Sequence, residues 1–280
     1  MPMKDYKKQY YEQSCHWERN YIQNPAEEER IKEIIGAIPS DAHSLLDVGC
    51  GNGAFVNTIV RSFSNKFVRI IGLDTSEKAL EFVKSEKTHA TITSLPFAND
   101  SFDLVTCLEV LEHLTYQEFR KGILELQRVS KKYIIITVPN DQHLTSSLIM
   151  CPECHCWFNP SFHMRTFNEH SLHNLFNNFT LLKMKGIGPL LRECHSNNHL
   201  LLFLLILYRI SSRALPPETP ICPQCGYRYK KKLNTIVNSK TKPVYLLRDT
   251  LFSFKPLVKM IWPKTKKSLW LLALYEKTHI

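Results

Sequence analysis

The 280-residue chain is 44% hydrophobic and 22% charged, which places it among soluble globular proteins with one large domain, or one domain with an insertion. Its polar N-terminus lacks the apolar core of a signal peptide, and nine cysteines, an odd number, argue against an exported protein held by disulfides. The longest apolar run, Leu200 to Tyr208, is too short to cross a membrane as a helix, so no transmembrane segment is expected. We therefore expect a cytoplasmic protein with thiols or a metal.

The positive charge is concentrated near the C-terminus. Residues 226–280 contain 13 Lys and Arg but 2 Asp and Glu, a charge of +11, whereas the other 225 residues carry a net charge of −1. A field of this size attracts acidic lipid headgroups, nucleic acid or a phosphorylated substrate. Pro243 to Trp262 alternates apolar and basic residues, as surface-binding amphipathic helices do, which predicts peripheral contact with an anionic membrane. The alternative is a solvated basic face that keeps the protein soluble.

From residue 24 onward the chain alternates helical and strand patterns. A helix is predicted to begin at Asn24-Pro25, a favourable N-cap followed by a proline in the first turn. Strands are predicted at 44–48, 68–73, 88–92, 102–107, 133–138, 179–186 and 268–275, and helices at 54–63, 76–85 and 116–129. Capping boxes, Thr115 with Glu118 and Thr166 with Glu169, mark two helix starts. The alternation predicts an α/β fold with a parallel sheet.

Three glycines at alternate positions, Gly49, Gly51 and Gly53, follow the first predicted strand. Glycine lets the backbone turn sharply and approach a ligand, and the helix that follows presents free amide groups. A dinucleotide-binding turn would place the third glycine one residue later, and Asp47 before the turn suits a cationic ligand. A nicotinamide-binding domain and a turn without a ligand are the alternatives.

With Asp74 at the end of the second strand, this stretch resembles the cofactor-binding core of class I S-adenosylmethionine-dependent methyltransferases. The segments Ser-Leu-Pro-Phe at 94–97 and Cys-Leu-Glu-Val-Leu-Glu-His-Leu at 107–114 resemble ubiquinone-type O-methyltransferases of the methyltransferase type 11 group. The resemblance implies a Rossmann-like, seven-stranded, mostly parallel sheet with helices on both faces. We expect residues 41–189 and 266–280 to form this core, residues 1–40 a helical lid, and residues 190–265 an insertion.

The resemblance also implies that S-adenosylmethionine binds along the glycine turn. Asp74 would accept hydrogen bonds from the ribose hydroxyls; the alternative is an acid at a helix start, where Thr75-Ser76 forms the cap. Many relatives have an acid at the position of Thr91, so here the adenine contact is expected from backbone groups around Thr93 and Ser94. The expected cofactor contacts are Asp47, Gly49, Cys50, Gly51, Gly53, Asp74, Thr75, Ser94, Leu95 and Leu108.

On the acceptor side we nominate His113 as a general base, because a neutral imidazole can take a proton near neutral pH. The alternative is that the Glu-His pair is structural, since the sulfonium already activates the methyl group. The leading segment of similar methyltransferases folds across the cofactor, and the expected lid and substrate residues are Tyr10, Tyr11, Trp17, His163 and Arg165. Core packing is the alternative for the three aromatic residues.

Two cysteine pairs, Cys151-Pro-Glu-Cys154 and Cys222-Pro-Gln-Cys225, have 67 residues between them. In a Cys-Pro-x-Cys turn the bend orients two thiolates toward one ion, so two such turns predict a closed structural zinc site. His155, Cys156 and His163 are reserve ligands. Unrelated thiols or a redox dithiol are the alternatives.

These observations predict a methyltransferase that acts on an oxygen or nitrogen of a small or lipid-linked metabolite, which the basic region suggests is anionic. Methylation of RNA is a second hypothesis, suggested by the zinc site and the basic tail, although no stretch resembles a dedicated RNA-binding module. A third is a binding or scaffold protein that keeps the fold without turnover.

Overall fold

A computed structural model describes residues 6–13, 17–18, 24–63, 65–192, 220–228 and 266–278. The chain divides into two compact units. The cysteine unit comprises Met1–Tyr10, His143–His163 and Leu191–Lys267, and the core unit comprises Tyr11–Gln142, Met164–Leu190 and Ser268–Ile280. The apolar run from Leu200 to Tyr208 and the amphipathic segment at 243–262 lie outside the described residues. No helix in the described ranges is long and apolar enough to cross a membrane.

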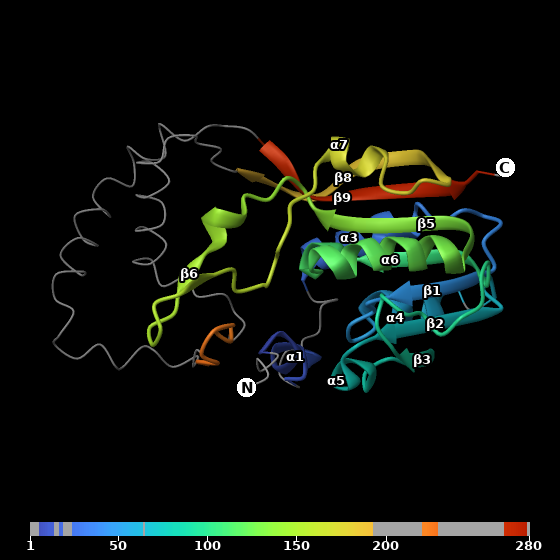
Figure 1. The fold of residues 1–280 in the computed structure, drawn as a ribbon. Coiled ribbons are helices and arrows are strands. Elements are labelled where there is room, and N and C mark those ends of the chain that lie inside the picture. Colours follow the sequence, from blue (N-terminus) through green and yellow to red (C-terminus); the bar gives the residue numbers. More distant parts are fainter. Residues whose placement is uncertain are drawn as a thin grey trace. The chain divides into compact units, whose positions relative to one another are not determined.

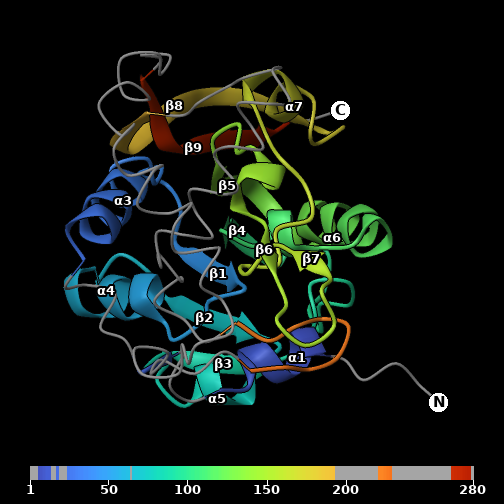
Figure 2. The same cartoon turned by 90° about the vertical axis from the view of Figure 1, so that its left-hand side faces the viewer.

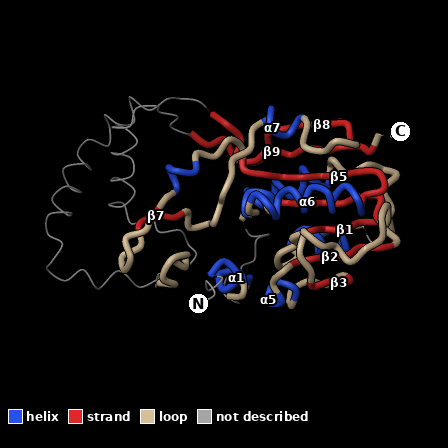
Figure 3. Tube along the Cα trace, in the orientation of Figure 1, coloured by secondary structure: helices blue, strands red, loops and turns tan. Residues whose placement is uncertain are grey.

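The core unit contains a seven-stranded sheet in the order β3-β2-β1-β4-β5-β9-β8 (Figure 1). The strands are β1 (Ser44–Val48), β2 (Arg69–Asp74), β3 (Glu86–His89), β4 (Phe102–Leu108), β5 (Ser130–Pro139), β8 (Phe179–Arg192) and β9 (Lys266–Lys277). Strands β1 to β5 pair in parallel, and β9 runs antiparallel to β5. The strands cross the core unit as adjacent red tubes in Figure 3. The predicted seven-stranded, mostly parallel sheet is confirmed.

Helices cover both faces of this sheet (Figure 2). Helices α3 (Pro25–Ile35) and α4 (Ala54–Ser62) lie on one face, and α6 (Tyr116–Val129) and α7 (Glu169–His173) on the other. Successive strand residues point to opposite faces, so Leu45 joins the apolar cluster under α3 and α4, and Leu46 joins the cluster under α6. The sheet is therefore buried on both sides, as a parallel sheet requires.

The two predicted capping boxes have different outcomes. Thr115 and Glu118 form the expected box at the start of α6, with each side chain accepting from the other residue's backbone N–H. The box expected from Thr166 and Glu169 is wrong, because Asn168 caps α7 and pairs with Ser171. The chain is still extended at Phe167, which bridges to Asn140, so the helix starts later than predicted.

The region between β2 and β4 also departs from the prediction. Helix α5 (Glu77–Leu80) is shorter than the predicted 76–85, and β3 overlaps the predicted 88–92 but begins and ends earlier. In the register with β2, His89 lies opposite Asp74, so both strands end at the same level. Thr91 instead bridges to Ser94 in a turn. In contrast, β5, β8 and β9 extend beyond their predicted bounds.

The described part of the cysteine unit has little regular structure. A short hairpin pairs β6 (Ile149–Met150) with β7 (Trp157–Phe158), and Ile221 bridges to Arg228. A 3-10 turn covers Leu144–Ser147, and α1 (Tyr6–Tyr11) ends where the core unit begins. One buried apolar cluster of the cysteine unit consists of Cys151, Phe158 and Cys222.

Candidate functional site

The three glycines after β1 form a turn in the left-handed region. Their φ angles are 78° at Gly49, 54° at Gly51 and 78° at Gly53. The backbone N–H groups of Gly49 and Cys50 both donate to the Leu73 carbonyl, at 2.7 and 2.9 Å, which fixes the turn to the end of β2. A Cβ on Gly49 would lie 2.3 Å from Val110, and one on Gly51 would lie 2.9 Å from Trp17. Only glycine fits this path.

The turn lies where the strand order reverses, since β1 is flanked by β2 on one side and by β4 on the other. Ligands of open α/β sheets bind at such a switch point, beyond the carboxyl ends of the strands. Helix α4 begins after its N-cap residue Gly53, and no side chain of the described residues caps it. Its first backbone N–H groups therefore remain available to an anionic group such as a carboxylate.

Asp47 is a buried acid on β1 just before the turn. Its neighbour on β4, Thr106, donates a hydrogen bond of 2.6 Å to Oδ1. Burial raises the pKa of Asp47 to about 7, although the Thr106 hydroxyl and the positive charge of Arg30 oppose this shift. Burial therefore favours the protonated carboxyl of Asp47 relative to an exposed aspartate.

Asp74 connects the turn after β1 with the turn after β2. Its Oδ2 accepts from the Gly51 backbone N–H at 2.9 Å, and its Oδ1 accepts from the Ser76 backbone N–H at 2.8 Å. Burial raises the pKa of Asp74, and these two N–H groups oppose the rise. Ser76 caps α5, and the exposed Thr75 accepts from His89 through its carbonyl. The cap expected in the alternative interpretation of Asp74 is thus present, while ribose binding stays a prediction.

Part of the N-terminal segment lies against these turns within the core unit. The Tyr11 carbonyl accepts from the Ser76 hydroxyl at 2.9 Å, and the Trp17 carbonyl accepts from the Asn52 amide at 3.0 Å. Tyr10, in contrast, belongs to the cysteine unit, where its ring lies 5.1 Å from that of Phe162.

The predicted adenine loop is held by α6. The Leu95 N–H donates to Glu125 at 2.7 Å, and the Leu95 carbonyl accepts from Arg128 at 2.9 Å. Glu125 and Arg128 also form an ion pair of 2.6 Å with each other. Ser94, also in this loop, donates its N–H to the Thr91 carbonyl. The sequence prediction did not include Glu125 and Arg128, although an acid and a base three residues apart on a predicted helix suggest such a pair.

His113 lies in a 3-10 turn (Leu111–His113) after β4. The Tyr11 hydroxyl is 3.1 Å from its Nδ1, and Glu112 Oε1 is 3.8 Å from its Nε2. Leu108, the last residue of β4, is partly buried against the cluster under α3 and α4. The structure therefore brings His113 together with Tyr11, one of the residues predicted for the lid.

Two acids at the same turn, the partly buried Glu109 just before it and the buried Glu112 within it, were not among the predicted site residues. Glu109 has a φ of 57°, and Val110 beside it lies against Gly49. In the described part of the chain, Oε1 of Glu109 and both carboxylate oxygens of Glu112 have no hydrogen-bond partner. Burial raises the pKa of Glu109 to about 7, and the nearby positive charge of Arg30 opposes the rise. The sequence did contain a signal for them: two acidic residues occur in an otherwise apolar segment at the end of a predicted strand.

The two remaining predicted substrate residues fall in different units. Arg165 belongs to the core unit, donates to the Leu114 carbonyl at 2.7 Å and lies 4.1 Å above the Phe119 ring. Burial lowers the pKa of Arg165. His163 belongs to the cysteine unit. In the core unit Arg165 thus packs the segment before α7 against the start of α6.

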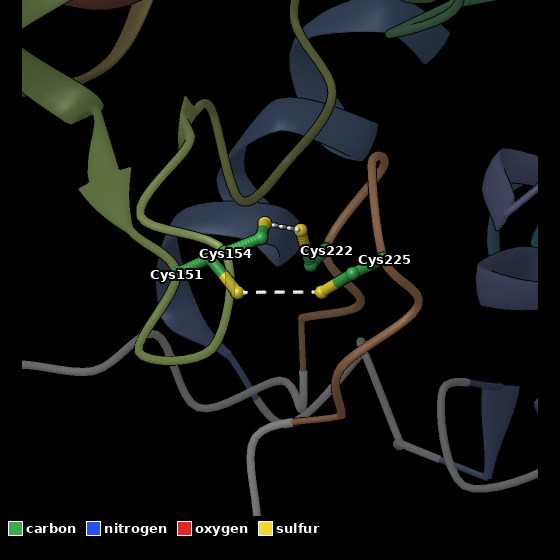
Figure 4. Close-up of side chains that lie close together, drawn as sticks. All are labelled: Cys151, Cys154, Cys222 and Cys225. Carbon is green, nitrogen blue, oxygen red and sulfur yellow. Dashed lines mark hydrogen bonds between the residues drawn. The ribbon is translucent and has the colours of Figure 1, made fainter.

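The four predicted metal ligands converge in the cysteine unit (Figure 4). Their sulfur atoms all lie within 4.8 Å of one another. Cys151 faces Cys225 at 3.6 Å, and Cys154 faces Cys222 at 3.5 Å. Burial opposes ionisation of Cys222, but backbone N–H groups of the second turn and neighbouring thiols lower its pKa to about 6.

Comparisons with known proteins agree with this geometry. Residues 46–136 match the family model of the methyltransferase domain. An uncharacterized protein of Methanocaldococcus jannaschii is 39% identical over 102 residues, 35% of this chain and 41% of the relative. A ubiquinone biosynthesis O-methyltransferase of Nitrosomonas europaea is 32% identical over 101 residues, 32% of this chain and 40% of the relative. The small RNA 2′-O-methyltransferase of Arabidopsis thaliana is 28% identical over 156 residues, 49% of this chain and 16% of the relative.

Among solved structures, a similar chain comes from the complex between the Haloferax volcanii Trm112 methyltransferase activator and a partner described as a methyltransferase. The TM-score is 0.54 at 12% identity, with 99% of this chain and 98% of that chain covered, so the likeness concerns the fold. Residues 46–136 of the core unit thus match a methyltransferase domain, which confirms the resemblance to class I S-adenosylmethionine-dependent methyltransferases seen in the sequence. Within that class, it is similar to the ubiquinone-type O-methyltransferases, and the chain spans less than half the length of these three relatives.

Proposed function

We propose that the protein transfers the methyl group of S-adenosylmethionine to an oxygen or nitrogen nucleophile of a small or lipid-linked, anionic metabolite. The observation that carries this proposal is the left-handed glycine turn at the switch point of the sheet, tied to Asp74 through the Gly51 N–H. When bound, the cofactor supplies an activated methyl group on a sulfonium. The protein has to bind, orient and dehydrate the two reactants.

The proposed cofactor contacts are assigned to protein groups that can still form hydrogen bonds with a ligand. The α4 start can bind the carboxylate end, because no side chain in the described part of the sequence caps its N–H groups. The Asp74 carboxylate accepts from the backbone N–H groups of Gly51, Thr75 and Ser76, and an ionised carboxylate offers about four acceptor sites, so capacity remains for a ribose hydroxyl. Leu95, fixed by Glu125 and Arg128, supports the proposal that this loop holds the adenine.

On the acceptor side, His113 is the proposed general base, and Tyr11 holds its imidazole through Nδ1. Glu109 is the second candidate, because its Oε1 has no partner in the described part of the chain and a pKa of about 7 suits proton transfer at neutral pH. If a side chain acts as the general base, the rate of methyl transfer depends on its ionisation. Replacing that side chain with one that does not titrate should remove this pH dependence. We expect His113→Gln or Glu109→Gln to do this, and a profile unchanged in both variants would contradict a general base.

Transfer of labelled methyl groups from the cofactor into lysate metabolites and lipid extracts tests the reaction. Gly51→Ala should reduce transfer at least about tenfold, because a left-handed alanine costs about 1–2 kcal/mol and its Cβ meets Trp17. Gly36→Ala is the matched control, since Gly36 has an ordinary helical φ and only van der Waals contacts for an added Cβ. Cofactor binding without transfer to any pool would instead support the scaffold hypothesis.

RNA methylation is the second candidate. It is favoured by the 28% identity to a small RNA 2′-O-methyltransferase over 49% of this chain, and by the basic region. Incorporation of label into short RNA, exceeding that into lipid and metabolite extracts, would select this candidate. Equal inactivity on single-stranded and duplex RNA would remove it.

The proposed anionic acceptor and peripheral membrane contact rest on the charge of residues 226–280, most of which lie outside the described residues. Binding to vesicles with anionic lipid should fall steeply with salt, because screening acts within about 8 Å at physiological ionic strength. Salt-insensitive binding would leave only a solvated basic face.

We retain the cytoplasm as the proposed location. The proposed cofactors also include a structural zinc ion in the cysteine unit.

A further inference from the structure

We infer that the two Cys-Pro-x-Cys turns bind one zinc ion through Cys151, Cys154, Cys222 and Cys225, and that the neighbouring Cys156 stays outside the ligand set. This inference deepens the zinc proposal by choosing four of five adjacent thiols. It is independent of methyl transfer, because it rests on the cysteine unit alone.

The two turns have the same backbone structure. In the first, the His155 N–H donates to the Cys151 carbonyl at 3.0 Å, and the Cys151 N–H donates to the Cys156 carbonyl at 2.9 Å. In the second, the Gly226 N–H donates to the Cys222 carbonyl at 2.9 Å, and the Cys222 N–H donates to the Tyr227 carbonyl at 2.8 Å. The same two hydrogen bonds thus close both turns.

The residue after each second cysteine is left-handed, with φ of 58° at His155 and 76° at Gly226. Glycine adopts this conformation freely, but a histidine there costs about 1–2 kcal/mol. The first turn therefore takes the same shape as the second against its local preference. A shared ligand that needs two matching turns accounts for this.

The sulfur positions fit an ion better than disulfides. A tetrahedral zinc ion with Zn–S bonds of about 2.3 Å separates its sulfur atoms by about 3.8 Å. The facing pairs lie 3.6 and 3.5 Å apart, and all four sulfurs lie within 4.8 Å of one another. A disulfide requires about 2.05 Å, so neither pair is bonded.

Cys156 is close to the cluster but does not complete it. Its Sγ lies 3.3 Å from that of Cys222, yet it is not one of the four thiols that are mutually close. Its carbonyl already closes the first turn by accepting from Cys151. With the four sites of a tetrahedral ion filled, Cys156 is left to donate its S–H to the Cys222 sulfur.

Two variants of the first turn, Cys154→Ser and Cys156→Ser, provide a matched test. Zinc content of the full chain, purified without chelator, should be about one per chain in the wild type and in Cys156→Ser. Cys154→Ser should lose most of the metal. Equal loss in the two variants would overturn the choice of ligands, and a wild type with little zinc would overturn the site.

Since Cys154→Ser could lose metal by misfolding, the wild-type chain gives a second readout. Reconstitution with cobalt(II) alone should produce the strong thiolate-to-cobalt charge-transfer absorption of a four-sulfur tetrahedral site, equal in Cys156→Ser. A weaker spectrum in Cys156→Ser would place Cys156 in the ligand set. Iron as the native metal, or disulfides detected by alkylation and mass spectrometry, would overturn the assignment of zinc.

Discussion

The two units of the chain are stabilised by different physical effects. The core unit buries large apolar clusters on both faces of its sheet, with Leu46 and Ile136 on one face and Leu45 and Ile135 on the other. The described part of the cysteine unit buries far fewer apolar side chains, among them Tyr10, Phe158, Phe162 and Ile221. Burying each of them contributes about 1.5–3 kcal/mol, whereas one structural zinc contributes on the order of 10 kcal/mol. We therefore expect the metal to be the largest single contribution to the stability of the cysteine unit.

The difference also shows how each unit positions chemical groups. In the core unit, parallel strands end at one edge, so Asp47, Asp74 and Glu109 follow from the strand register. In the cysteine unit, two turns from distant segments have to meet before any site exists. We therefore expect the core to form its site without a ligand, and the cysteine unit to depend on its metal.

Removal of the metal should have the largest effect. A chelator that strips zinc from the full chain should expose residues 143–163 and 220–228 to proteases, since on the order of 10 kcal/mol of stabilisation is lost. The fragments that span 24–142 should stay resistant. Mass spectrometry of the limited digest measures both, and equal resistance of the first segments with and without chelator would show that the metal does not hold them.

The converse experiment weakens the core alone. Ile136→Ala removes a fully buried side chain in the centre of β5 and should cost about 2–5 kcal/mol of unfolding free energy. Zinc content should remain that of the wild type. Denaturant unfolding and metal analysis of the same sample give the two values, and loss of zinc in this variant would show that the units do not fold separately.

The smallest expected effect is a pH dependence of opposite sign in the two units. Asp47 has a pKa of about 7 when folded, above its ordinary value of about 3.9, so its contribution to stability is complete below pH about 4 and is lost as the pH rises through 7. Between pH 6 and 8 this loss is on the order of 1 kcal/mol. Zinc binding changes in the opposite direction, since protons compete for thiolates.

Asp47→Asn isolates the Asp47 contribution, because asparagine does not titrate. Glu109 has a raised pKa in the same range and keeps part of the wild-type slope, so the comparison is between the two slopes. The variant should unfold with a shallower pH dependence between pH 6 and 8. Parallel slopes in denaturant titrations would contradict a raised pKa at Asp47.

Most of the sheet could be predicted from the sequence, because its buried strands are continuous apolar runs that end at glycine, proline or acidic residues. The edge strand β3 could not, since Glu86–His89 is mostly exposed and its limits are set by pairing with β2. The predicted start of α7 was wrong for a similar reason, because the bridge between Phe167 and Asn140 is a tertiary contact.

The sites show the same division. The glycine turn and the cysteine pairs were predictable, because local backbone geometry and ligand chemistry dictate those residue types. The contacts of Tyr11 with His113, and of Glu125 with Leu95, join residues 102 and 30 positions apart. Sequence spacing carries no information about such pairs. The unpartnered oxygens of Glu112 likewise depend on what the fold packs around them.

Calorimetric titration of the full chain tests the central claim, that the core unit holds a methyltransferase cofactor site independent of the metal. S-adenosylmethionine should bind with similar affinity before and after zinc removal. Asp74→Ala should weaken it by about 1.5–3 kcal/mol, roughly 10- to 150-fold, the scale of hydrogen bonds to a charged group. Binding of NADH in place of S-adenosylmethionine, or an Asp74→Ala variant with wild-type affinity, would contradict the account.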